Sequence, residues 1–270
     1  MTNIKEQLDT AARIVNESSY LIALVGAGMS KESGIPTFRG GDGLWDKHGE
    51  PPMDGYQRML ADPAAWWAEW QAQRQSQAGD ELTRAIEEAK PNAGHIALAE
   101  MERRGYLKHI ITQNIDNLHQ EAGSTAITEI HGNRTKMRCI NCMRRWGRDE
   151  FVLTDASASL SAGSPPRCPD CEGLVKSDTV MFGEPIPPDA LESCFREAQR
   201  ADAVLLLGTS AAVYPAAEFP VIAYRNGGKL IEVNPQETPL SELCSAVLRA
   251  PSGHVLPALL EEVGKLDTGS

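Results

Sequence analysis

Short apolar runs alternate with amphipathic stretches along most of the chain. The apolar runs predict buried strands at residues 20–28, 107–114, 127–132, 178–183, 201–208 and 227–234, with a weaker one at 245–250. Between them, apolar positions recur three or four residues apart, which predicts helices at 1–18, 91–105, 115–123, 187–201, 214–228 and 253–266. Buried strands that alternate with helices predict an α/β fold, with a parallel sheet covered by helices on both faces.

Two stretches interrupt this alternation. Residues 40–90 contain no strand candidate and are typical of a glycine-rich loop followed by helices, and residues 134–177 contain two cysteine pairs. We expect these insertions to form a small second module. The remaining residues, 1–39, 91–133 and 178–270, are then expected to form a Rossmann-like domain. Within the module, the helical spacing of Trp66, Trp67 and Trp70 indicates packing rather than a substrate cage.

Charge narrows the possible partners. The 270 residues include 26 Lys and Arg against 37 Asp and Glu, a net charge of −11, and the pI is near 5.1. Such acidity argues against nonspecific binding to nucleic acid or to an anionic membrane, and favours a basic partner such as a lysine-rich peptide. The chain has neither an apolar run long enough to cross a membrane nor a secretory signal at its start, so we expect a cytoplasmic protein.

Four of the six cysteines form the most specific chemical pattern, Cys139-x-x-Cys142 and Cys168-x-x-Cys171. Two such pairs offer four thiolates for one tetrahedral Zn²⁺, and four cysteine ligands leave no open position, so the metal is expected to be structural. Cysteines buried without a metal are the less favoured alternative. A nucleic-acid-binding ribbon is another, although the basic stretch 138–148 is only local in an acidic chain.

The first predicted strand ends in a glycine turn. Gly26 and Gly28 would let backbone N–H groups approach a pyrophosphate, while Phe38 could cover a ring and Arg39 could meet a phosphate. The dehydrogenase fingerprint needs a third glycine where Lys31 stands, which disfavours hydride transfer. A glycine turn without a ligand remains the alternative.

Polar residues also follow the next two strands. Gln113, Asn114 and Asp116 stand where a strand ends and a helix begins, and His131 ends the following strand. Helix capping explains part of the first group, and a lone histidine is more often structural than catalytic. Because parallel strands end at one edge of the sheet, where α/β proteins bind ligands, we nevertheless expect His131 to be catalytic.

The fifth and sixth predicted strands, 201–208 and 227–234, also end in glycine or polar residues. Gly208 is followed by Thr209 and Ser210, which could hydrogen-bond a cofactor, and Asn234 is suited to a ribose hydroxyl. Each of these turns alone is ordinary in α/β proteins. Together, five strand ends with polar or glycine signatures predict a nucleotide site.

The succession of these motifs resembles the sirtuins, NAD-dependent protein lysine deacylases. In chain order the matching segments are GAGMSKESGIPTFRG, TQNID, HGN, the two cysteine pairs, VMFGE, GTS and VNP. The segments PNAGH and GTSAAVYPAA are most similar to the bacterial-type branch that includes desuccinylases. The resemblance implies a Rossmann-like domain with a smaller zinc-ribbon and helical module, and NAD and acyl-lysine proteins as substrates.

The resemblance also implies roles for individual residues. His131, the general base, and Asn114 would be catalytic. The residues implied to hold NAD are Gly26, Ala27, Gly28, Phe38, Arg39, Gln113, Asn114, Asp116, Gly208, Thr209, Ser210, Asn234 and Ser252. Acyl-lysine is expected to enter as an extended chain between two segments, which contain Phe182, Gly183 and Glu184 on one side and Val213 and Tyr214 on the other.

In the implied reaction the acyl group moves from lysine to ADP-ribose and nicotinamide is released, while a loop over residues 37–48 keeps water out. Two departures from the family pattern bear on substrates. Asp178 and the absence of a neighbouring proline alter the substrate-side strand. The Tyr-x-x-Arg pair of desuccinylases is missing before PNAGH, where only Arg84 is in range, so we predict a preference for uncharged acyl groups such as acetyl.

Two other functions remain open at this point. A mono-ADP-ribosyltransferase would use the same NAD pocket but would label a protein with ADP-ribose. A noncatalytic reader of acyl-lysine or nucleic acid could be built on the zinc ribbon. Neither a membrane nor a specific nucleic acid is expected as a partner.

Overall fold

The computed structural model describes residues 4–39, 43–74, 77–152 and 164–268. Its main element is a six-stranded sheet with the order β3-β2-β1-β7-β8-β9, in which every pairing is parallel. The strands are β1 (Leu21–Val25), β2 (Leu107–Thr112), β3 (Ile127–Glu129), β7 (Ala203–Leu207), β8 (Lys229–Val233) and β9 (Ala246–Leu248). Six of the seven predicted strands are therefore confirmed, including the weak one at 245–250.

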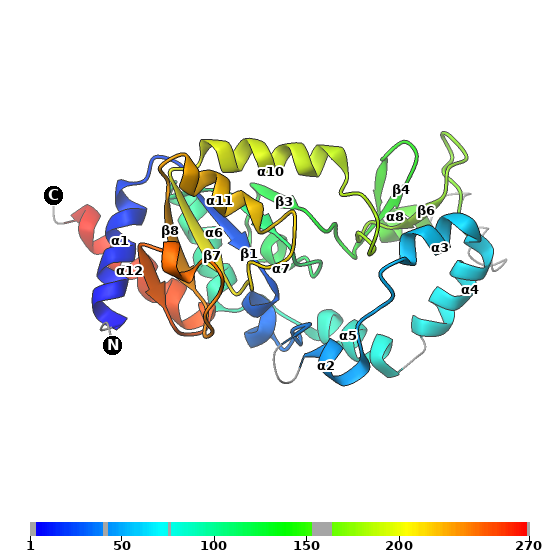
Figure 1. The fold of residues 1–270 in the computed structure, drawn as a ribbon, viewed down its shortest axis with the longest axis horizontal. Coiled ribbons are helices and arrows are strands. Elements are labelled where there is room, and N and C mark those ends of the chain that lie inside the picture. Colours follow the sequence, from blue (N-terminus) through cyan, green and yellow to red (C-terminus); the bar gives the residue numbers. More distant parts are fainter. Residues whose placement is uncertain (1–3, 40–42, 75–76, 153–163, 269–270) are drawn as a thin grey trace.

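Helices cover both faces of this sheet because the apolar strands expose side chains to both sides. One face packs against α1 (Ile4–Glu17), α6 (Ala93–Arg103) and α12 (Ser252–Thr268). The other packs against α10 (Pro188–Arg200) and α11 (Glu218–Arg225). Strand β1 shows the division, since Ala23 lies in the first core with Leu98, and Leu24 lies in the second with Phe219. Figure 1 shows the two layers on either side of the strands.

A second, antiparallel sheet lies at the opposite end of the molecule from the chain termini (Figure 1). It has the order β5-β4-β6, from β4 (Lys136–Cys139), β5 (Arg145–Gly147) and β6 (Val175–Ser177), and α8 (Arg148–Val152) follows β5. Its core contains Met137, Trp146, Phe151 and Val175. This small sheet occupies the insertion that contains the cysteine pairs.

The other insertion is helical, as predicted. It contains α2 (Leu44–His48), α3 (Gly55–Ala61), α4 (Pro63–Arg74) and α5 (Gln77–Glu88). Figure 1 shows α3 beside the small sheet and α2 and α5 nearer the large one. Trp67 is buried in α4, which agrees with a packing role. Part of the predicted loop over 37–48, residues 40–42, lies outside the described residues.

The prediction of a sheet strand at residues 178–183 is wrong. The chain leaves the small sheet at Ser177, and the next residues run as bends and turns without joining either sheet. The apolar residues Val180, Met181 and Phe182 are only half-buried. The buried residue of the run is the charged Asp178, which is ionically paired. The sequence pattern suggested a strand because it does not distinguish apolar residues in a core from apolar residues that line a surface.

Among the described residues, no helix has both the length and the apolar character that a membrane crossing requires.

Candidate active site and metal centre

The predicted site residues converge because the main strands end level with one another. Val25 pairs with Thr112 on one side and with Leu207 on the other, and Leu207 pairs with Val233. The turns that follow these strands therefore meet at one edge of the sheet. Strand order reverses between β1 and β7, and ligands of open α/β sheets bind at such a reversal.

Two glycine turns touch at this reversal. Gly28 N donates to Gly208 O at 2.8 Å, and a Cβ atom at Gly26 or Gly28 would lie 2.8 Å from the Gly208 backbone. Gly208 also has a φ of +55°, which favours glycine. The glycines are thus needed by the protein itself, to let the ends of β1 and β7 approach. The short helix η1 (Ala27–Ser33) follows the first turn.

A connected polar cluster lies beside these turns. The Asn114 Nδ2 atom donates to Gly26 O and to Ser30 Oγ, both at 3.1 Å, and Ser30 Oγ donates to Asp116 Oδ2 at 2.7 Å. Burial raises the pKa of Asp116, while its hydrogen bonds from Ser30 and from the backbone N–H of Leu118 oppose that shift. Sequence reasoning missed Ser30. Its position in η1, one turn after Gly26, was the available signal.

This cluster forms the polar wall of a pocket that is partly open to solvent. Ala27, Phe38, Asn114 and Asp116, all predicted cofactor residues, line the pocket with Ser30. The rest of the lining is apolar and comes from three segments, through Ile35, Pro36, Leu82, Ile86 and Ile115. An apolar lining with one carboxyl group and one amide fits a flat ring that bears a carboxamide, which is the chemistry of nicotinamide.

His131 is hydrogen-bonded to Gln113, the residue that precedes Asn114 of this cluster. Its Nδ1 atom lies 3.1 Å from the Gln113 carbonyl oxygen, and the Gln113 side chain donates to Thr209 Oγ1 at 2.9 Å. A carbonyl only accepts, so Nδ1 carries the proton and Nε2 keeps its lone pair. Burial lowers the pKa of His131, and the hydrogen bond to Gln113 partly opposes this. His131 is therefore a neutral imidazole whose Nε2 can take a proton.

After β7 and β8, two further residues predicted to hold NAD, Thr209 and Asn234, are also neighbours. Asn234 Nδ2 donates to Thr209 O at 2.8 Å and holds the two turns together. Ser252 is buried at the start of α12, whereas Ser210 is exposed.

The predicted substrate residues differ in how they face solvent. Phe182 O accepts from Tyr56 N at 3.2 Å, and Gly183 O accepts from Gln57 Nε2 at 3.2 Å, so α3 holds this segment. Val213 and Tyr214 are exposed, Tyr214 to 74%. The Glu184 carboxylate is instead 3% exposed and points to cations of the small sheet.

An aromatic contact that the sequence did not reveal joins the cofactor side to the substrate side. The Trp45 ring lies 5.4 Å from Phe38 and 5.7 Å from Phe182, centroid to centroid. The Arg39 guanidinium lies 4.5 Å from the Trp45 ring and pairs with Glu50 at 3.2 Å. Trp45 therefore contacts residues that were predicted separately for NAD and for acyl-lysine.

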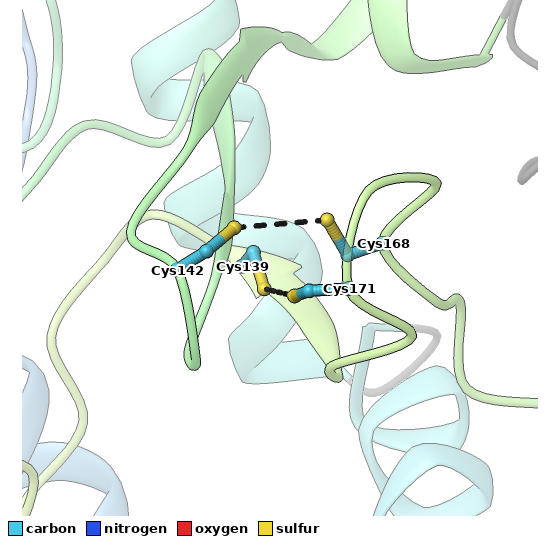
Figure 2. A group of neighbouring side chains, drawn as sticks. All are labelled: Cys139, Cys142, Cys168 and Cys171. Carbon is cyan, nitrogen blue, oxygen red and sulfur yellow. Dashed lines mark hydrogen bonds between the residues drawn. The ribbon is translucent and has the colours of Figure 1, made fainter.

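The four predicted zinc ligands come together at one end of the small sheet (Figure 2). Their Sγ atoms all lie within 4.8 Å of one another, with Cys139 to Cys171 at 3.6 Å and Cys142 to Cys168 at 3.8 Å. A tetrahedral Zn²⁺ with bonds of about 2.3 Å separates its sulfur ligands by about 3.8 Å, whereas a disulfide bond is only about 2.0 Å long. The geometry fits one tetrahedral zinc ion.

The two cysteine pairs also share a turn geometry. Met143 N donates to Cys139 O and Glu172 N donates to Cys168 O, at 3.1 and 3.0 Å. The residue after each second cysteine has a positive φ, 60° at Met143 and 56° at Glu172. Matching turns of this kind present both thiolates of each pair toward a common centre, which supports a metal over cysteines that are merely buried.

Comparisons with known proteins agree with this geometry. The sequence profile of the Sir2 family matches residues 26–215. An NAD-dependent protein deacylase of Pyrococcus furiosus is 41% identical over 261 residues, which cover 96% of this chain and 99% of that protein. A Sir2 homologue solved with ADP-ribose is 38% identical with a TM-score of 0.77, over 96% of this chain and 97% of the other. A Sir2 protein solved with a p53 peptide and NAD⁺ is 34% identical with a TM-score of 0.74, over 98% of this chain and all of the other.

Proposed function

Since this chain belongs to the Sir2 family, we propose that it is an NAD-dependent protein lysine deacylase. The observation that carries the proposal is the hydrogen bond from His131 to the carbonyl of Gln113, the residue next to Asn114 of the Ser30–Asn114–Asp116 pocket. The relative and the two structural neighbours named above are 34% to 41% identical to the chain over nearly its full length, and the two structures hold ADP-ribose and NAD⁺. The acyl group passes from lysine to ADP-ribose, and nicotinamide is released.

NAD supplies the ribose carbon to which the acyl oxygen bonds. The residues of this chain bind and orient NAD. We propose that Asp116 and Asn114 hold the carboxamide of nicotinamide, because they form the polar wall of the pocket. The turn at Gly26, Ala27 and Gly28, which touches Gly208, would receive the pyrophosphate. Thr209, Ser210, Asn234 and Ser252 would hold the adenosine half.

The role proposed for His131 is to take a proton from a ribose hydroxyl at Nε2. The Gln113 carbonyl keeps the proton on Nδ1, and burial keeps the ring neutral near pH 7. Both effects favour a base at Nε2. Phe38, which contacts Trp45 and lines the pocket, would help to exclude water from the reacting sugar carbon.

The proposed acyl donor is an acyl-lysine peptide bound along Phe182 and Gly183, opposite Val213 and Tyr214. The carbonyl groups of Phe182 and Gly183 are held by α3, which keeps this wall fixed while a chain docks beside it. The net charge of −11 favours the approach of a lysine-rich segment. We also propose that residues 40–90 and 134–177 form one small module beside the Rossmann-like domain of residues 1–39, 91–133 and 178–270.

Zinc has a structural role in this proposal. Cys139, Cys142, Cys168 and Cys171 would occupy all four positions of one ion, which leaves none for substrate or water. The metal would then stabilise the small sheet, which contacts the substrate segment.

Uncharged acyl groups are the proposed substrates. Arg84 of α5 is exposed, whereas its neighbours on the same helix, Leu82 and Ile86, line the pocket. Helix α5 contains no tyrosine, so the Tyr-x-x-Arg pair with which desuccinylases bind the acyl carboxylate is missing. We predict that kcat/KM for an acetyl-lysine peptide exceeds that for the matched succinyl-lysine peptide, and a reversed order would contradict the proposal.

The function itself is tested by incubating the protein with NAD and a panel of acyl-lysine peptides, and by measuring peptide masses. We expect deacylation that requires NAD and falls about 100-fold or more in His131→Ala, as is typical when a general base is removed. An exposed histidine, His254, supplies the matched control, and His254→Ala should keep the activity. Peptides that stay acylated in the presence of NAD would contradict the proposal.

A further inference from the structure

Three cations lie in one row across the small sheet. Arg138 of β4 is paired in register with Arg145 of β5 on one side and with Lys176 of β6 on the other. The side chains of Arg138 and Lys176 are only 1% and 2% exposed. Like charges directly opposite each other on neighbouring strands are destabilising, so this arrangement requires anions between the cations.

Both anions come from the segment that follows β6. Asp178 Oδ1 lies 2.7 Å from Arg138 Nε and 3.1 Å from Arg145 Nε. Glu184 bridges the other gap, with Oε1 2.8 Å from Arg138 Nη2 and Oε2 2.8 Å from Lys176 Nζ. Cation and carboxylate therefore alternate through these five residues, which we call the charge row.

Stability alone does not explain the charge row. Buried ion pairs lose their hydration, and replacing them with apolar residues of similar size is often neutral or stabilising. A buried ionic row does, however, fix geometry, because each carboxylate has one position in which it reaches both of its cations. The charge row thus sets how the 178–184 segment lies on the small sheet.

The segment held in this way contacts His131 and Gly132 near its beginning and carries the proposed substrate residues near its end. Val180 N donates to His131 O at 2.9 Å, and a Cβ atom at Gly132 would lie 2.1 Å from Asp178 O. Toward its other end the segment carries Phe182 and Gly183, the proposed wall for acyl-lysine. Displacement of either anchor would move this wall relative to His131.

We propose that the charge row is the positioning device for the acyl-lysine wall, with Glu184 and Lys176 as positioning residues that act through Phe182 and Gly183. The inference rests on the proposed function and adds a specific role to residues of the zinc-bearing sheet. It also gives Glu184 a role other than direct contact with the peptide, since its carboxylate is turned toward the sheet.

The test is the steady-state kinetics of Glu184→Gln with an acetyl-lysine peptide and NAD, together with thermal unfolding. We expect the KM for peptide to rise about tenfold to hundredfold, as a small misplacement of binding groups produces, while the KM for NAD stays within about twofold. In Lys176→Met/Glu184→Gln, cation and carboxylate are removed together. This double variant should therefore be less impaired than the product of the two single effects.

A matched control distinguishes positioning from a general loss of stability. Glu197 of α10 is also a buried carboxylate, 5% exposed and paired with Arg196, but it lies near Tyr20 at the opposite edge of the main sheet. Glu197→Gln should lower the unfolding temperature without raising the KM for peptide. If Glu184→Gln changes the two KM values in the same way as Glu197→Gln, the inference is wrong.

A milder variant keeps the test decisive if Glu184→Gln does not fold. Arg145 ends the charge row, is 30% exposed and also pairs with Asp189 of α10. Arg145→Gln should raise the KM for peptide severalfold. If the wild type is active and the KM for peptide is unchanged in Arg145→Gln, the role of the charge row is refuted and the proposed function is not. A wild type that does not deacylate would instead refute the proposed function.

Discussion

At the scale of single residues, the contact between His131 and the Gln113 carbonyl decides which imidazole nitrogen can act as a base. The carbonyl accepts from Nδ1, so only Nε2 has a free lone pair. Burial also lowers the pKa of the ring below its ordinary value near 6.5. The position of His131 after a strand was predictable from sequence, but its tautomer was not, because that depends on a backbone atom 18 residues away.

The pH dependence of catalysis follows from this environment. A base must be neutral to act, and the pKa of His131 is shifted downward, so activity should persist below pH 6.5 and fall only at more acidic pH. The measurement is the pH profile of kcat/KM. An acidic limb centred above pH 6.5 would contradict the assignment, and the control His254→Asn should leave the profile unchanged.

Two other histidines, which are buried beside each other, affect stability rather than catalysis. His95 and His119 are buried, their rings lie 4.8 Å apart, and burial lowers their pKa values to about 4 and about 3. Asn92 N donates to His95 Nδ1 at 3.3 Å, so the neutral ring also serves as a helix cap.

Acid should therefore destabilise the fold through these two rings. As pH falls below about 6.5, these histidines become protonated in the unfolded chain but stay neutral in the folded protein. The free energy of unfolding therefore decreases until the pH reaches their pKa values in the folded protein. For His95 alone the loss between pH 7 and pH 4 is about 3 kcal/mol.

Denaturant unfolding at several pH values measures this effect. His119→Phe should reduce the acid sensitivity, whereas the exposed His254→Phe should not. Equal pH dependence in His119→Phe and the wild type would contradict the prediction.

At the scale of elements, regular strands were predictable and the substrate segment was not. The strands of the main sheet are apolar runs buried on both sides, as in β1 and β7, and such runs give a clear pattern. Residues 178–183 carry a similar pattern but are held by His131, α3 and the charge row. Contacts between distant segments decided their conformation, and a local pattern does not contain that information.

The cysteine pairs were predictable because their chemistry is local. Each pair is formed within four consecutive residues, and its turn is fixed by hydrogen bonds within the same stretch. Trp45, in contrast, could not be assigned, because its contact with Phe182 joins residues 137 positions apart in sequence.

The zinc assignment predicts one bound metal per chain that supports folding. Cys139→Ser or strong chelation should remove zinc and lower the unfolding temperature, since a structural zinc site contributes on the order of 10 kcal/mol to folding. Metal analysis and thermal unfolding measure both effects. Cys244→Ser is the matched control, because the Cys244 thiol lies outside the four-cysteine group and donates to Leu240 O, so the zinc content should be unchanged. A metal-free wild type of full stability would refute the assignment.

At the scale of the whole molecule, the two sheets divide the work of the proposed reaction. The parallel sheet brings five strand ends together and so builds the nucleotide side of the site. The small sheet carries the cysteine cluster at one end and holds the substrate segment through the charge row. The fold class and the edge of the sheet that carries the site were predictable from motif order, whereas the coupling between the sheets required the structure.

The central claim is that one acyl group moves from lysine to ADP-ribose for each NAD consumed. Mass spectrometry of all products, with adenine-labelled NAD and an acetyl-lysine peptide, tests it most directly. We predict equal amounts of free-lysine peptide, nicotinamide and labelled acetyl-ADP-ribose, with no label on protein. Label attached to protein while the peptide stays acetylated would contradict the account and would instead indicate an ADP-ribosyltransferase.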